Sequence, residues 1–177
     1  MSSLGLYIIK LPGKRTDEDI LESLGYRRPS LKGDISIRAA CDRGFRDTAV
    51  FRYAGKVIIV DHFKPYDHSY SPGETNPFDK MLSATSMNGT GFTAFLDGVS
   101  GTYGYSLYEQ GECRRKYAVT PNETLVDEGD ALTAESAEEE GDPEQRIFAI
   151  IQGLIGVDFS DLVSENNLTG MAYRMTG

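Results

Sequence analysis

The sequence predicts an α+β fold of mostly antiparallel sheet, with about seven strands and three helices in the order β-α-β-β-β-α-β-β-β-α. Two apolar segments are each followed, after a short turn, by another strand-like segment, which is typical of antiparallel hairpins. Two Asx-Pro pairs, Asn76-Pro77 and Asp142-Pro143, each precede a stretch with helical periodicity. A chain of 177 residues fits one domain, which we expect to span residues 1–177.

The first elements follow from one apolar run and one set of helix signals. Residues 4–11 form an apolar run that predicts a strand. Thr16 is a typical helix N-cap before three acidic residues, and Gly25 is typical of the position just after a helix end. Residues 35–41 are apolar enough to predict the next strand.

Two hairpins with similar turns come next. Their strands are expected at residues 48–52 and 56–62, and at residues 103–108 and 112–119. Glycine is the third residue between the strands in both, which favours a three-residue loop with a left-handed last residue. This loop would pair Phe51 with Val57, and Leu107 with Cys113. In the second hairpin a two-residue loop would instead set Leu107 against Arg114, so the longer loop is preferred.

The remaining elements are two helices and one more strand. The helices are expected from Pro77 to near Asn88 and from Pro143 to Gly156, with a strand at residues 91–97 before the second hairpin. Because strand, hairpin and Pro-initiated helix recur in this order, the sequence also suggests a degenerate internal duplication.

The net charge of −9 has a local origin in residues 127–144, which hold nine acidic side chains and no Lys or Arg. We expect this stretch to be a mobile acidic loop, and Glu138, Glu139 and Glu140 are its candidate contacts with a partner protein that has a basic surface. The sequence shows no concentrated basic stripe, so nucleic acid is not an expected partner.

The compartment is expected to be the cytoplasm. No apolar run approaches the length of a membrane span and no signal peptide is recognisable, so no membrane association is predicted. Cys41 and Cys113 form no C-x-x-C pair, and both are expected to be buried, reduced thiols.

The segment around residues 61–68 holds both histidines of the chain, each directly after an aspartate. Imidazole and carboxylate groups bind zinc and other divalent ions, so Asp61, His62, Asp67 and His68 are candidate metal ligands. The alternative is a set of polar surface residues that close a strand. Phe63, Tyr66 and Tyr70 lie in the same region, where they would form a recognition surface or pack onto the domain.

Part of the chain resembles a pattern found in uncharacterised bacterial domains of unknown function. The resemblance covers residues 103–159: a strand with an acidic-Gly turn, an Arg-bearing return strand, the Gly-x-x-Leu-x-x-Glu segment at residues 129–135, and a closing amphipathic helix. It implies a bacterial origin and no particular activity.

No nucleophile–base pair, phosphate-binding loop or strong metal motif is recognisable in the sequence. The preferred hypothesis is therefore a non-enzymatic protein that binds another protein in a bacterial cytoplasm, with no cofactor. Two alternatives stay open: a metal-dependent hydrolase or related enzyme that uses the Asp61-His62/Asp67-His68 segment, and a small-ligand sensor domain. The sequence leaves the oligomeric state open.

Overall fold

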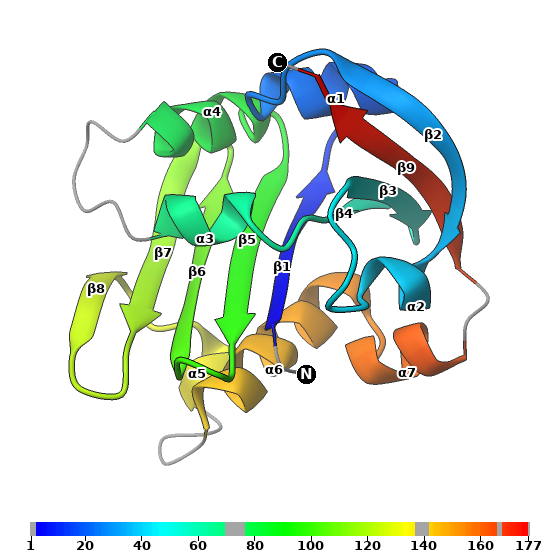
Figure 1. Cartoon of the computed structure of the whole chain (residues 1–177). Helices are drawn as coiled ribbons and strands as arrows, with labels where there is room; N and C mark the ends of the chain where they lie inside the picture. Colours follow the sequence, from blue (N-terminus) through cyan, green and yellow to red (C-terminus); the bar gives the residue numbers. More distant parts are fainter. Residues whose placement is uncertain (1–2, 70–76, 137–141, 166–167, 177) are drawn as a thin grey trace.

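The computed structural model describes residues 3–69, 77–136, 142–165 and 168–176. One nine-stranded antiparallel sheet runs through it in the order β2-β9-β3-β4-β1-β5-β6-β7-β8 (Figure 1). The strands are β1 (Ser3–Lys10), β2 (Pro29–Ser36), β3 (Thr48–Tyr53), β4 (Lys56–Val60), β5 (Thr90–Asp97), β6 (Thr102–Glu109), β7 (Glu112–Val119), β8 (Thr124–Gly129) and β9 (Thr169–Met175).

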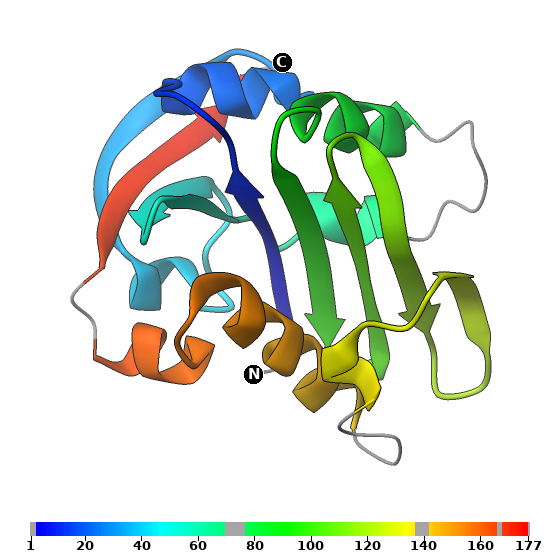
Figure 2. The same ribbon diagram turned by 180° about the vertical axis from the view of Figure 1, so that it is seen from behind.

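Helices cover both faces of this sheet. Those in the described residues are α1 (Asp17–Ser23), α2 (Ile37–Ala40), α3 (Lys64–Ser69), α4 (Pro77–Thr85), α5 (Thr133–Ser136), α6 (Pro143–Ile155) and α7 (Phe159–Ser164). Helix α3 crosses one face of the sheet in Figure 1, and α6 crosses the opposite face in Figure 2. Two apolar clusters fill the layers: one joins α1 and α4 to the sheet, and the other joins α2, α6 and α7 to its opposite face.

The predicted fold class is confirmed, but the element count is not. The described residues form nine strands and seven helices rather than about seven and three. Strand β8 escaped prediction because it is a mostly exposed edge strand, and β9 because exposed residues interrupt its short apolar run.

The expected strand at residues 35–41 is correct only at Ile35 and Ser36, because β2 begins earlier, at Pro29, and residues 37–40 are helical. Strand β2 ends at Ser36, whose hydroxyl accepts a hydrogen bond from the backbone N–H of Ala39 at 3.2 Å, and α2 follows. Ser36 is therefore an N-cap, and an N-cap serine outweighs the β-propensity of the single Ile37 beside it.

Both expected hairpin registers are also wrong, because both turns contain two residues. Tyr53 pairs with Lys56, and Ala54 and Gly55 form the turn at φ values of 49° and 75°. Two left-handed residues are typical of the two-residue turn that matches the twist of a hairpin. Phe51 consequently pairs with Ile58 rather than Val57.

The second hairpin has a two-residue turn at Gln110 and Gly111 and, further along its strands, a β-bulge. Tyr108 pairs with Cys113, but Leu107 pairs with Arg115, so Arg114 is the extra residue. Because side chains alternate along a strand, Arg115 and Lys116 lie on opposite faces of the sheet. The thiol of Cys113 lies near the turn and is exposed, contrary to expectation, whereas Cys41 is buried as predicted.

The helix signals at Thr16 and Asp142 are confirmed, whereas Asn76 of the Asn76-Pro77 pair lies outside the described residues. Thr16 accepts a hydrogen bond from the N–H of Asp19 at 3.1 Å and caps α1. Asp142 caps α6, which ends at Gly156 with φ 84°. The acidic stretch of residues 127–144 contributes Asp127–Gly129 to β8, all of α5 and the first turn of α6; its residues 137–141 lie outside the described ranges.

Within the described residues, no helix is both long and apolar enough to cross a membrane.

Candidate functional site

The carboxylate of Asp61 lies at the end of β4 and is buried, with 6 % of the residue exposed. Its Oδ2 accepts hydrogen bonds from the hydroxyls of Tyr26 at 2.7 Å and Thr48 at 3.3 Å. Its Oδ1 accepts from the backbone N–H groups of Phe63 and Lys64 at 2.9 and 3.0 Å. Both oxygens are thus occupied, and Asp61 joins the connection between α1 and β2, the start of β3 and the start of α3 to the end of β4.

His62 faces the opposite side of the sheet. Its Nε2 lies 2.9 Å from the carbonyl oxygen of Ala40, so Nε2 carries the proton and donates. Its Nδ1 is buried and has no hydrogen-bond partner among the described residues. The structure therefore separates the imidazole of His62 from the carboxylate of Asp61, as two successive residues on an extended chain require.

The other candidate metal ligands, Asp67 and His68, belong to α3, but their side chains lie outside the described part. The described residues contain no group of three or more His, Cys, Asp or Glu side chains that could hold a metal ion. Tyr70, Glu138, Glu139 and Glu140, which were expected to bind a partner, also lie outside the described ranges.

Phe63 and Tyr66 are the two candidate binding residues that the structure describes. Phe63 is 53 % exposed, and the guanidinium of Arg46 lies 5.5 Å from its ring centroid. Tyr66 is 38 % exposed and packs edge-on against Phe95, with 5.0 Å between ring centroids. Tyr66 is thus held against the sheet, whereas Phe63 stands at the surface.

Phe63 and Asp61 share a hollow of about 640 Å³, which we call the basic hollow. It is formed by the connection from α1 to β2, the segment that enters β3, the connection from β4 to α3, and the end of β9. Its lining residues are Gly25, Tyr26, Arg27, Arg46, Asp47, Thr48, Asp61, Phe63, Lys64, Tyr173, Arg174 and Met175.

The floor of the basic hollow is made of fixed polar groups. Tyr26, Thr48, Asp61 and Tyr173 are all buried. Burial, the neighbouring Tyr7 and the carboxylate of Asp61 together raise the pKa of Tyr26 well above its ordinary value, so its hydroxyl stays protonated and donates to Asp61. The hydroxyl of Tyr173 donates to Asp17 at 3.1 Å, which ties the end of β9 to α1.

Lys64 gives the hollow a charge that depends on pH. Its Nζ lies 3.8 Å from the ring centroid of Tyr26. Burial lowers the pKa of this ammonium to about 8; the carboxylate of Asp61 raises it and the guanidinium of Arg27 lowers it further. Lys64 therefore changes charge near neutral pH, unlike an exposed lysine.

The rim of the basic hollow is cationic. The hollow is lined by four cationic side chains (Arg27, Arg46, Lys64 and Arg174) and two carboxylates. Arg174 holds Asp47 through hydrogen bonds of 2.8 and 3.1 Å, which lower the pKa of that carboxyl. Among the described residues, neither Arg27 nor Arg46 forms an ion pair with a carboxylate. The result is an excess of positive charge in a chain whose net charge is −9.

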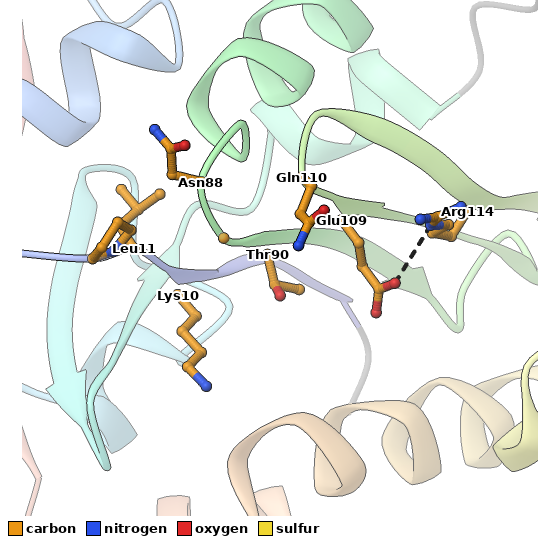
Figure 3. A pocket seen from close by; sticks show the side chains of 9 residues that line it. Lys10, Leu11, Asn88, Thr90, Glu109, Gln110 and Arg114 are labelled. Atoms are coloured by element: carbon orange, nitrogen blue, oxygen red, sulfur yellow. Dashed lines mark ion pairs between the residues drawn. The ribbon is translucent and has the colours of Figure 1, made fainter.

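A second hollow, of about 520 Å³, lies at another end of the sheet (Figure 3). Arg114 turns toward Glu109, with 3.4 Å between Nε and Oε2, and Lys10 lies on the other side of Thr90. No residue that lines this hollow is buried, and its charges largely pair with one another. It lacks the fixed polar floor of the basic hollow and is the weaker candidate.

Sequence reasoning found Asp61 and Phe63 but missed the rest of the basic hollow. Tyr26, Thr48 and Tyr173 come from distant parts of the chain and look like ordinary strand or loop residues. The available signal was Asp61 itself, a carboxylate directly after four apolar residues of a buried strand, which needs hydrogen-bond donors from elsewhere.

Comparisons with models of protein families, with curated proteins and with solved structures find no match in any of the three. We therefore infer the function from the geometry of this chain.

Proposed function

We propose that this protein binds a small anionic molecule in the basic hollow, which develops the ligand-sensor alternative. The observation that carries the proposal is the set of four cationic side chains around a buried, hydrogen-bonded floor. A hollow of about 640 Å³ falls within the roughly 300–1,000 Å³ of small-molecule sites.

The chemistry of the rim favours an oxyanion such as a phosphate or a carboxylate. Guanidinium groups offer several N–H donors in one plane and bind such anions with two parallel hydrogen bonds. Arg27 is exposed, whereas Arg46 is oriented by hydrogen bonds to backbone carbonyl oxygens. Arg174 and Lys64 are held in place by Asp47 and by the ring of Tyr26. Three of the four cationic groups are therefore positioned before an anion binds.

The preferred hypothesis from the sequence, binding to another protein, remains a prediction, because most of the residues expected to carry it lie outside the described ranges. The hydrolase alternative also remains a prediction. It requires Asp61 to give up hydrogen bonds from four donors before its carboxylate could bind a metal ion, which would uncover buried polar groups. That the protein works in a bacterial cytoplasm also remains a prediction.

The test is calorimetric titration of the full chain with inorganic pyrophosphate at pH 7 and low salt. We expect saturable binding that Arg27→Gln weakens about tenfold, since a charge-assisted hydrogen bond is worth roughly 1.5–3 kcal/mol. The matched control is Arg28→Gln, an equal change of charge at the adjacent exposed residue, which does not line the hollow. If pyrophosphate does not bind, or if both variants weaken binding equally, the proposal fails.

A further inference from the structure

Phe63 separates the basic hollow from a neighbouring one. The neighbour has a volume of about 280 Å³ and is lined by Ser3, Arg43, Arg46, His62, Phe63, Asp97 and Val99; we call it the side hollow. Phe63 and Arg46 line both. A ligand longer than a simple anion could therefore occupy the two hollows by passing along the ring of Phe63.

Phe63 is exposed, but its backbone is fixed and its ring lies against Arg46. Its backbone N–H donates to Asp61 at 2.9 Å, and Arg46 lies against the ring. Arg46 is itself oriented by hydrogen bonds from Nη1 to the carbonyl oxygens of Arg43 at 2.6 Å and Phe45 at 3.2 Å. An aromatic side chain that is oriented in this way loses little conformational entropy when a ligand binds, and its ring offers a flat apolar surface.

The side hollow has the character of a site for a flat ring. Two of the large apolar side chains that the described structure exposes most, Phe63 at 53 % and Val99 at 73 %, line it together. The polar residues Ser3, Arg43 and Asp97 also line it. Asp97 accepts hydrogen bonds from the N–H of Val99 at 3.1 Å and the hydroxyl of Ser100 at 2.8 Å, so the turn that carries Val99 is fixed.

We infer that the ligand of the proposed site is a nucleoside phosphate, with its phosphates in the basic hollow and its base against Phe63 in the side hollow. The inference rests on the proposed function and names the ligand class. Stacking of a base on an aromatic side chain is tolerant of sequence and supplies affinity beyond that of the phosphates. The cationic rim binds the phosphates, and the ring and Val99 exclude water from one side of the base.

The experiment compares ADP with pyrophosphate by calorimetry in buffer that contains EDTA. Both ligands carry two phosphoryl groups, so their difference reports the nucleoside. We expect ADP to bind about tenfold more tightly than pyrophosphate, within the range measured for base–aromatic stacking. Phe63→Leu should bring the ratio of the ADP affinity to the pyrophosphate affinity down to about one, and Phe63→Tyr, which keeps the ring, should preserve the tenfold ratio.

The outcomes separate the two proposals. If ADP and pyrophosphate bind with equal affinity, the nucleoside inference is overturned and the anion site stands. If Phe63→Leu weakens both ligands equally, the ring acts by positioning Arg46, and the inference is again overturned. If neither ligand binds, the proposed function itself fails.

Discussion

The charged side chains that this protein buries are held by partners from distant parts of the chain. Arg115 is 4 % exposed and pairs with Glu135 through two hydrogen bonds of 2.9 Å, from Nε and Nη2. Lys116, on the other face of β7, pairs with Asp79 of α4 at 2.6 Å. Such pairs add little net stability compared with apolar residues, but removal of one member leaves an unpaired buried charge, which strongly destabilises the folded state.

Replacement of Glu135 by Gln should therefore destabilise the fold. We expect a loss of about 2–3 kcal/mol at pH 7, somewhat below the roughly 3–5 kcal/mol for a fully broken buried pair, because Arg115 keeps its contact with Asp127. Urea unfolding followed by circular dichroism measures the change. Glu128→Gln, at an exposed position nearby, is the control and should change stability by less than about 0.5 kcal/mol.

The same pair predicts how stability depends on pH. Burial disfavours the charged form of Glu135 and is the largest single effect. Hydrogen bonds from Arg115 and from the backbone N–H of Leu132, together with the charge of Arg115 and the neighbouring Tyr105, outweigh it and hold the pKa of Glu135 below its ordinary value. The carboxylate of Glu135 thus binds a proton less readily in the folded state than in the unfolded state. The contribution of the Arg115–Glu135 pair to stability is therefore fully present above the ordinary pKa of glutamate, and it is lost as pH falls through the pKa of Glu135 in the folded state. The difference between the wild type and Glu135→Gln should shrink in acid. A constant difference down to pH 3 would contradict this assignment.

The charge of Lys64 leads to a third prediction at the scale of one residue, about ligand binding. Its pKa of about 8 means that the ammonium, which faces Asp61, Arg27 and the ring of Tyr26, loses its charge as pH rises through that value. Affinity for sulfate, whose own charge is constant in this range, should fall between pH 7 and pH 9. Lys64→Arg should bind sulfate with little pH dependence, since guanidinium stays charged. An equal decline in both proteins would exclude Lys64 as the cause.

Among the elements, the turns show best what local sequence can and cannot determine. Gly55 and Gly111 correctly marked both hairpins, yet the loop lengths were wrong because Ala54 and Gln110 also adopt left-handed φ values of 49° and 51°. A non-glycine residue seldom adopts this conformation, so sequence patterns favour the alternative with one left-handed residue. Pairing across the whole sheet decides the register instead.

Glycine substitutions test which turns tolerate a side chain. Gly55 and Gly129 both have positive φ, 75° and 81°, but a Cβ at Gly55 would meet nothing within 4 Å, whereas one at Gly129 would lie 2.1 Å from the carbonyl oxygen of Arg114. Gly55→Ala should cost about 1 kcal/mol, the strain of a left-handed alanine. Gly129→Ala should cost clearly more, because β8 must move away from β7. Equal losses in thermal unfolding experiments would refute this difference.

At the scale of the whole molecule, the basic hollow depends on a topology that the sequence does not reveal. Strand β9 lies between β2 and β3, so the last segment of the chain brings Tyr173 and Arg174 beside Asp17 and Asp47. The fold class, most strands and the capped helices follow from local patterns. Long-range strand order does not, because many antiparallel arrangements satisfy the same alternation of apolar residues. The residues that surround Asp61 could therefore not be assembled in advance.

Removal of β9 should accordingly destroy both the fold and the site. In a chain that ends at residue 167, the edges of β2 and β3 that pair with β9 lose their backbone hydrogen-bond partners. Val50 and Phe51, which are buried beside β9, become exposed. We expect such a chain to aggregate or to lack cooperative unfolding, and to bind no pyrophosphate. The control ends at Met175 and loses the hydrogen bond from Thr176 to the carbonyl oxygen of Arg28 at 3.1 Å, but keeps the strand. If the shorter chain unfolds cooperatively and still binds pyrophosphate, β9 does not complete the basic hollow.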